Sequence, residues 1–155
     1  MIELLQKAPG FKLYDTDKKE VSLENLAGKN VLLLFFPLAF TSVCTEELCA
    51  VRDNITLYNN AKAVVLGISV DSVYTLKKFK EEQHLNFTLL SDFNKEVSAA
   101  YNSLYETFSL NMKGVSKRAA FVLDKNGMLI YKEILENAGD VPNFSAINDM
   151  VQRLA

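Results

Sequence analysis

The residue best suited to chemistry is Cys44, which follows a predicted strand and begins a predicted helix. The apolar run at residues 31–36 predicts the strand, and Thr41 or Ser42 is expected to cap the helix. In the first helical turn, backbone N–H groups and the positive end of the helix dipole stabilise a thiolate, the nucleophilic form of cysteine. The position therefore predicts a reactive thiol, and the competing interpretation is a small buried core residue.

A second cysteine, Cys49, follows five residues after Cys44. On an intact helix the two residues lie about 140° apart around the axis and about 7.5 Å apart along it. Their Cα atoms would then exceed the roughly 7 Å limit for a disulfide. If the two thiols bond, the first turns of this helix must therefore unwind. Cys49 is expected on the polar side of the helix, which also carries Arg52, Asp53 and Thr56.

Strands predicted from the sequence lie between turn residues. Apolar runs and alternating patterns indicate strands at residues 31–36, 63–70, 87–90, 119–123 and 128–134. The first two are continuous apolar runs, which are typical of strands buried on both faces. The Asn126-Gly127 turn joins the last two into a hairpin. A short alternation at residues 10–22 predicts a further hairpin at the N-terminus.

Helices are predicted between and after these strands. Helical periodicity indicates them at residues 42–60, 72–84, 95–104 and 143–154. The first helix has one apolar stripe, formed by Cys44, Leu48, Val51, Ile55 and Tyr58. Strands and helices alternate before a final hairpin and helix, which implies an α/β protein with a central mixed β-sheet flanked by helices. This order fits a thioredoxin-like fold, among other three-layer arrangements.

Composition excludes several classes of protein. The chain has 155 residues, 49% hydrophobic and 23% charged, which is typical of a single globular domain spanning residues 1–155. The net charge of −2 lacks the basic excess expected of a nucleic-acid or membrane-surface binder. The longest apolar run is about half of the roughly 20 residues needed to span a bilayer. With no signal-peptide pattern at the N-terminus, we expect a soluble, cytoplasmic protein that binds neither nucleic acid nor membrane.

Metal ligands are scarce in the sequence. It contains two cysteines and a single histidine, His84, which is distant from both of them in the chain. A structural zinc ion takes four nitrogen, sulfur or oxygen ligands, so no metal site is expected. Two cysteines also exclude a disulfide-rich scaffold.

Several motifs resemble the peroxiredoxins of the alkyl hydroperoxide reductase/thiol-specific antioxidant family. The spacing Pro37-x-x-x-Thr41-x-x-Cys44 is similar to their active-site signature, and the surrounding FFPLAFTSVCTEEL is close to their alkyl hydroperoxide reductase E type. Arg118, in SKRAAFVLDKNG, matches their catalytic arginine. The resemblance continues through APGFKLYD, GISVDS and LLSDFNKEVSAAY, over nearly the whole chain. It implies a thioredoxin-like (peroxiredoxin) fold, peroxide substrates and no metal or organic cofactor.

The resemblance implies a role for each matched residue. Cys44 would attack a peroxide oxygen as a thiolate and become a sulfenic acid. Thr41 would offer its hydroxyl to the thiolate and the peroxide, and Arg118 would keep the thiolate ionised and bind charge that develops on oxygen. Pro37 would line the pocket and exclude water, and Glu47 would orient Arg118. Without the resemblance, Thr41 would be read as a helix cap and Arg118 as a solvated charge at a strand end. Pro37 would be read as a strand terminator and Glu47 as a partner of the helix dipole.

The spacing of Cys44 and Cys49 resembles the peroxiredoxin Q (bacterioferritin-comigratory) type, whose resolving thiol lies in the same helix. It implies that Cys49 condenses with the sulfenic acid and that a thioredoxin-like or other dithiol reductant reopens the disulfide. The reductase E context keeps open a one-cysteine enzyme resolved by an external thiol, and it implies a homodimer that pairs near Leu38 and Phe40. A reactive thiol at Cys44 would also suit a redox sensor or a thiol–disulfide exchange protein, although an exchange protein normally has Cys-x-x-Cys.

Overall fold

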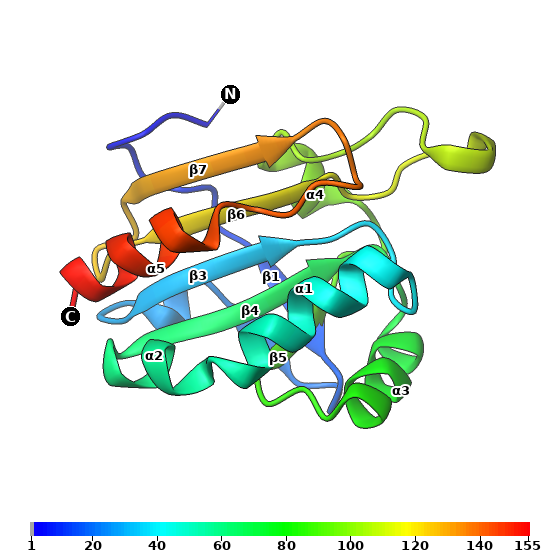
Figure 1. The fold of residues 1–155 in the computed structure, drawn as a ribbon. Helices are drawn as coiled ribbons and strands as arrows, with labels where there is room; N and C mark the ends of the chain where they lie inside the picture. The colour runs from blue at the N-terminus through cyan, green and yellow to red at the C-terminus, as the bar shows by residue number, and fades with distance from the viewer. Residues whose placement is uncertain (1) are drawn as a thin grey trace.

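A seven-stranded mixed sheet with helices on both faces organises the chain (Figure 1). The computed structural model describes residues 2–155. The strands are β1 (Lys12–Asp15), β2 (Glu20–Ser22), β3 (Asn30–Phe35), β4 (Ala63–Ser69), β5 (Thr88–Ser91), β6 (Arg118–Leu123) and β7 (Leu129–Leu135), and the sheet order is β2-β1-β5-β4-β3-β6-β7. The helices are α1 (Ser42–Asp53), α2 (Ile55–Asn60), α3 (Val73–Gln83), α4 (Glu96–Ala100) and α5 (Phe144–Arg153), with short 3-10 turns η1 (Glu24–Leu26) and η2 (Ser109–Asn111).

Strand direction brings distant segments to one end of the sheet. β3 pairs in parallel with β4 on one side and antiparallel with β6 on the other. Phe35, the last residue of β3, is therefore opposite Ala119, near the start of β6. The turn that leads from β3 into α1 consequently lies next to Arg118, although the two segments are far apart in the sequence.

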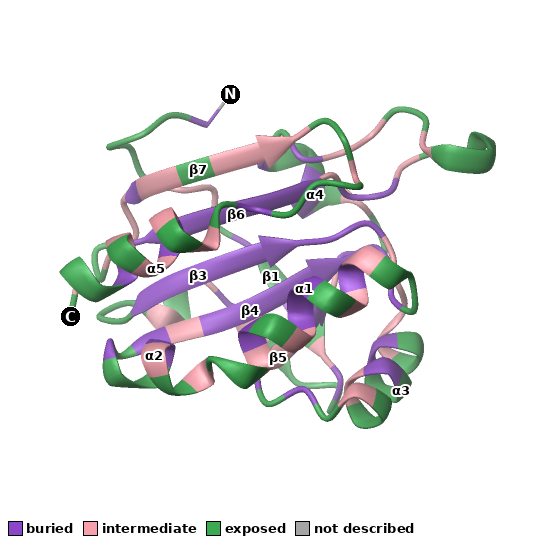
Figure 2. Cartoon of the chain, in the orientation of Figure 1, coloured by how far each residue is buried: buried purple, intermediate pink, exposed green. Residues whose placement is uncertain are grey.

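The alternation of side chains along β3 divides the core between the two faces of the sheet. Every residue of β3 and β6 is buried (Figure 2). Leu32 and Leu34 share one cluster with the buried faces of α1, α2, α3 and α5. Leu33 and Phe35 point to the other face, where they join a second cluster that includes Tyr101 after α4. Successive residues of a strand point to opposite faces, so a continuous apolar run is what this central strand requires.

The predicted helix at residues 42–60 is interrupted. α1 ends at Asp53, Asn54 has φ −114° and ψ 19°, and α2 begins at Ile55. Asparagine is a weak helix former because its side chain competes for backbone hydrogen bonds. The apolar stripe nevertheless continues across the break, since Tyr58 of α2 is buried in the same cluster as Leu48 of α1.

The predicted helix at residues 95–104 is shorter than expected. α4 ends at Ala100, and Asn102 adopts the left-handed conformation with φ 54°. Asparagine tolerates this conformation and commonly ends helices by it. Within residues 2–155, no helix is both long and apolar enough to cross a membrane.

We predict that Phe121→Ala lowers the free energy of unfolding by about 3–5 kcal/mol, because it removes a buried aromatic ring from the core. Phe121 is fully buried, and its ring centroid lies 5.6 Å from that of Phe35 and 5.1 Å from that of Tyr101. Urea unfolding measures the effect. Leu110→Ala is the control, because Leu110 is 88% exposed and should change stability by less than about 0.5 kcal/mol. Equal losses in the two variants would contradict this description of the core.

Candidate active site

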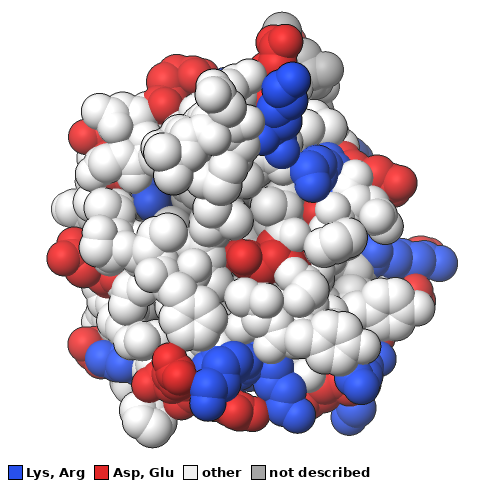
Figure 3. Space-filling model, turned by 90° about the vertical axis from the view of Figure 1, so that its right-hand side faces the viewer, with Lys and Arg blue, Asp and Glu red and all other residues white. Residues whose placement is uncertain are grey.

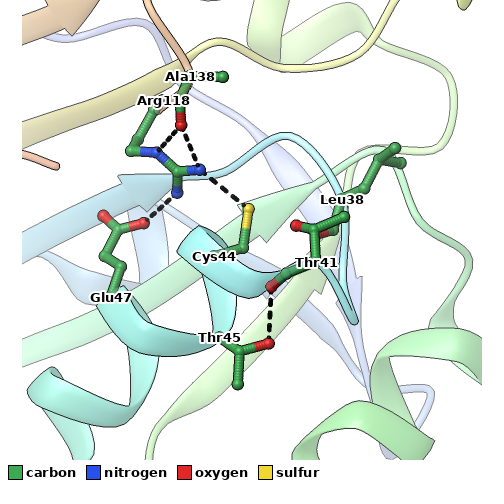
Figure 4. Close-up of polar contacts among 7 residues, drawn as sticks. All are labelled: Leu38, Thr41, Cys44, Thr45, Glu47, Arg118 and Ala138. Atoms are coloured by element: carbon green, nitrogen blue, oxygen red, sulfur yellow. Dashed lines mark hydrogen bonds and ion pairs between the residues drawn. The ribbon is translucent and has the colours of Figure 1, made fainter. Parts of the chain in front are cut away.

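Cys44 is buried in the first turn of α1, with 1% of its surface exposed. Thr41 is the N-cap residue, as expected, but its side chain makes no capping hydrogen bond. The Thr41 hydroxyl instead donates to the carbonyl oxygen of Leu38 at 2.8 Å, and the Thr41 carbonyl accepts from the backbone N–H and the hydroxyl of Thr45. The first turn of α1 is therefore closed by main-chain and threonine contacts around the cysteine (Figure 4).

Arg118 is buried at the start of β6 and contacts the thiol directly. Its Nη2 atom donates to Cys44 Sγ at 3.2 Å, and its Nη1 atom donates to Glu47 Oε1 at 2.7 Å (Figure 4). Its Nε and Nη2 atoms also donate to the carbonyl oxygen of Ala138, at 3.2 and 3.0 Å. A guanidinium is a permanent cation with a planar set of donors, so these contacts fix both its charge and its orientation beside the sulfur.

Glu47 is the buried anionic partner of Arg118. Its side chain is fully shielded from solvent, and its Oε2 atom has no hydrogen-bond partner among the described residues. Burial raises the pKa of the Glu47 carboxyl to about 7, although the charge of Arg118 and its hydrogen bond act in the opposite direction. Glu47 therefore exchanges a proton near neutral pH.

The loop between β3 and α1 is held by Asp71, a residue that the sequence patterns did not single out. Asp71, just after β4, accepts a hydrogen bond from the backbone N–H of Ala39 at 2.8 Å and one from the Ser69 hydroxyl at 2.6 Å, both at Oδ2. Pro37 is buried in this loop. The motif GISVDS contains Asp71 and was the available signal for it, whereas the Ala138 carbonyl is a main-chain atom and leaves no signal in the sequence.

Cys49 lies outside the cluster formed by Cys44, Glu47 and Arg118. It is half-buried, and its Sγ atom donates to Gln83 Oε1 of α3 at 3.6 Å. It was expected on the polar side of the helix, where Asp53 is exposed, and on this side it contacts Gln83 of α3. Both cysteines are free thiols.

Comparisons with known proteins point to one family. The model of the AhpC/TSA family matches residues 4–132. The peroxiredoxin bcp of Coxiella burnetii is 40% identical over 130 residues, which cover 83% of this chain and 85% of that protein. Alkyl hydroperoxide reductase E of Mycobacterium bovis is 37% identical over 144 residues, which cover 91% of this chain and 90% of that protein. The crystal structure of peroxidoxin BcpB from Mycobacterium tuberculosis matches with a TM-score of 0.85 and 27% identity, covering 99% of this chain and 97% of that chain.

A buried thiol at the start of a helix, bonded to a buried arginine on an α/β sheet, is an arrangement suited to a thiol-dependent oxidoreductase. The chain belongs to the AhpC/TSA family and is a peroxiredoxin, an enzyme of the peroxidase class. The expected thioredoxin-like fold is confirmed by the match to solved peroxiredoxins.

We predict that Glu47→Gln removes part of the pH dependence of stability. Folding raises the pKa of Glu47 from its ordinary 4.5 to about 7, so the folded protein binds this proton more tightly than the unfolded chain. The resulting stability is fully present below pH 4.5 and is lost as the pH rises through 7. Between these limits the wild type should lose up to about 3 kcal/mol relative to Glu47→Gln. Urea unfolding of both proteins from pH 4.5 to 8 measures this difference, and parallel curves would contradict it.

Proposed function

We propose that this enzyme reduces hydrogen peroxide and alkyl hydroperoxides through Cys44, forms a disulfide with Cys49 and is recycled by a thioredoxin-like or other dithiol reductant. The observation that carries the proposal is the 3.2 Å contact between Arg118 Nη2 and Cys44 Sγ in a buried setting. A guanidinium at hydrogen-bond distance can pair with the negative charge of a thiolate, the nucleophilic form of cysteine.

In the first step, the Cys44 thiolate attacks one peroxide oxygen and the O–O bond breaks. The attacked oxygen stays on sulfur as a sulfenic acid, and the leaving oxygen takes a proton to become water or an alcohol. Negative charge develops on the leaving oxygen in the transition state, and Arg118 is the nearest fixed cation. Glu47 and the Ala138 carbonyl hold its guanidinium in place, so little reorganisation is needed when the charge appears.

Thr41 and Pro37 complete the proposed substrate pocket. The Thr41 hydroxyl donates its hydrogen bond to the Leu38 carbonyl oxygen. The lone pairs of the hydroxyl oxygen are therefore available to accept a hydrogen bond from the hydroperoxide O–H. Pro37 is buried and has no N–H group, so it can line the pocket without adding a donor that water would bind. The side of the molecule on which β3 ends is mostly uncharged, with an acidic group near its middle and a row of charged groups along its lower edge (Figure 3).

In the second step, the Cys49 thiol attacks the sulfenic sulfur, and water leaves as the disulfide forms. The reductant then supplies two thiols and two electrons to reopen the disulfide. Since Cys44 and Cys49 are on one intact helix, α1 must partly unwind for this step. Phe40 is 48% exposed beside the site, and we include it with Leu38 in the proposed homodimer contact.

We predict that one equivalent of hydrogen peroxide removes two hydrogens from the intact mass of the wild type. Cys49→Ser should instead retain one oxygen, which a sulfenic-acid reagent traps, because the resolving thiol is absent. Cys44→Ser should keep its mass and serves as the control. A trapped sulfenic acid in the wild type would make this a one-cysteine enzyme resolved by an external thiol. No oxidation of the wild type at this dose would rule out the peroxidase proposal.

We predict that Arg118→Lys slows the first oxidation of Cys44 by about 10²–10³-fold. A lysine keeps the charge, but its single ammonium cannot bind the sulfur, Glu47 and the Ala138 carbonyl in the planar geometry of a guanidinium. The second-order rate constant with hydrogen peroxide, measured by rapid quenching and intact mass, reports the effect. Arg153→Lys is the matched control, because the Arg153 side chain is 72% exposed and pairs with Asp149 of α5 rather than with Cys44. The loss of an exposed ion pair would change the rate by roughly twofold or less. An effect of Arg118→Lys no larger than that would contradict the role of Arg118.

A further inference from the structure

Three hydrogen bonds that the proposed chemistry does not use tie the second half of α1 to α3 and to the residues that follow it. Cys49 Sγ donates to the side-chain oxygen of Gln83 at 3.6 Å, and Arg52 Nη1 donates to the main-chain oxygen of Gln83 at 2.6 Å. Asn86 Nδ2 donates to the main-chain oxygen of Arg52 at 3.2 Å. We call these four residues, Cys49, Arg52, Gln83 and Asn86, the clasp.

The same face of α3 also restrains the segment that enters α1. Phe40 packs against Phe79, with ring centroids 5.1 Å apart. Phe79 and Gln83 are four residues apart and therefore share one face of α3. Phe40 has φ 67°, a strained conformation for a residue other than glycine, so packing must hold it there. α3 thus contacts the second half of α1 through the clasp and the segment that leads into α1 through Phe40.

The break at Asn54 ends α1 before α2 begins. α2 has its own attachment, in which the Tyr58 hydroxyl donates to Asn148 Oδ1 of α5 at 2.7 Å. At the other end, Thr41 and Ser42 are exposed, so the first turn can open into solvent. α1 is consequently a separate helical segment, held by its buried residues Leu48 and Val51 in the core and by contacts at Arg118 and at α3.

We propose that Gln83 and Arg52 are positioning residues that keep α1 helical and thereby set how fast Cys49 reaches the oxidised Cys44. This inference rests on the proposed function, in which Cys49 is the resolving thiol. In that step the S–S bond forms, the S–O bond of the sulfenic acid breaks, and the hydroxyl leaves with the Cys49 proton as water. Cys44 is reduced and Cys49 is oxidised, so no further reductant is needed.

A competing reaction makes the rate of unwinding measurable. While α1 stays helical, a second hydrogen peroxide molecule can oxidise the sulfenic acid to a sulfinic acid and release water. The clasp therefore controls a partition: slow unwinding favours sulfinic acid, and fast unwinding favours disulfide. The ratio of the two products at high peroxide concentration reports on the clasp.

The test compares wild type, Gln83→Met, the double variant Gln83→Met/Arg52→Met, and Glu82→Met. Methionine has a length similar to that of glutamine but lacks its carbonyl oxygen, and Glu82 is the exposed neighbour of Gln83 on α3. Each protein is mixed with excess hydrogen peroxide, quenched at intervals and analysed by intact mass. We expect disulfide formation to be faster by about threefold in Gln83→Met and by about tenfold in the double variant, with a matching fall in sulfinic acid. Glu82→Met should behave as wild type.

Gln83→Glu is the conservative variant, because it keeps an acceptor oxygen for Cys49 and should restore the slow rate of the wild type. A role limited to overall stability would lower the free energy of unfolding without changing the ratio of disulfide to sulfinic acid, and that outcome would overturn the inference. Equal rates of disulfide formation in all four proteins would overturn it as well. Absence of any disulfide in the wild type would instead overturn the resolving role of Cys49, so the two failures are distinguishable.

Discussion

The buried charge of Arg118 is the constraint on which the site depends. A guanidinium inside a protein is costly unless its donors are paired, and here they are paired by Cys44, Glu47 and the Ala138 carbonyl. These partners come from α1 and from the loop between β7 and α5. The antiparallel register of β3 and β6 brings them together, because the end of one strand meets the start of the other. The contacts that pair this cation inside the fold thus hold a positive charge beside the sulfur of Cys44.

The Glu47 carboxyl and the Cys44 sulfur both accept hydrogen bonds from the Arg118 guanidinium. Burial raises the pKa of Glu47 to about 7, so near neutral pH the carboxyl is present in both forms. When it is ionised, it neutralises Arg118 and holds the guanidinium in position. When it is protonated, the positive charge is left to the sulfur alone. The carboxyl therefore balances orientation of Arg118 against the charge that Arg118 offers to Cys44.

Much of the fold was predictable because local patterns determined it. The apolar run at residues 31–36 became β3, and the Asn126-Gly127 turn joined β6 to β7. The helical wheel correctly gave the buried stripe of α1 but could not show that Cys49 contacts Gln83, because periodicity shows which way a side chain points and not which element packs there. The contact of Ala138 with Arg118 was beyond reach for a different reason, since a main-chain carbonyl has no identity in the sequence.

The proposed reaction sets two opposite demands on α1. Cys44 meets Arg118 only while the helix is formed, and it meets Cys49 only after the helix has opened. Oxidation of Cys44 connects the two demands, because a thiolate is an anion and a protonated sulfenic acid is neutral. The sulfur then loses much of its attraction to Arg118, and α1 loses a contact in its first turn. Attack on the peroxide thus removes one of the interactions that kept the helix closed, and the contacts with α3 remain to set how quickly it opens.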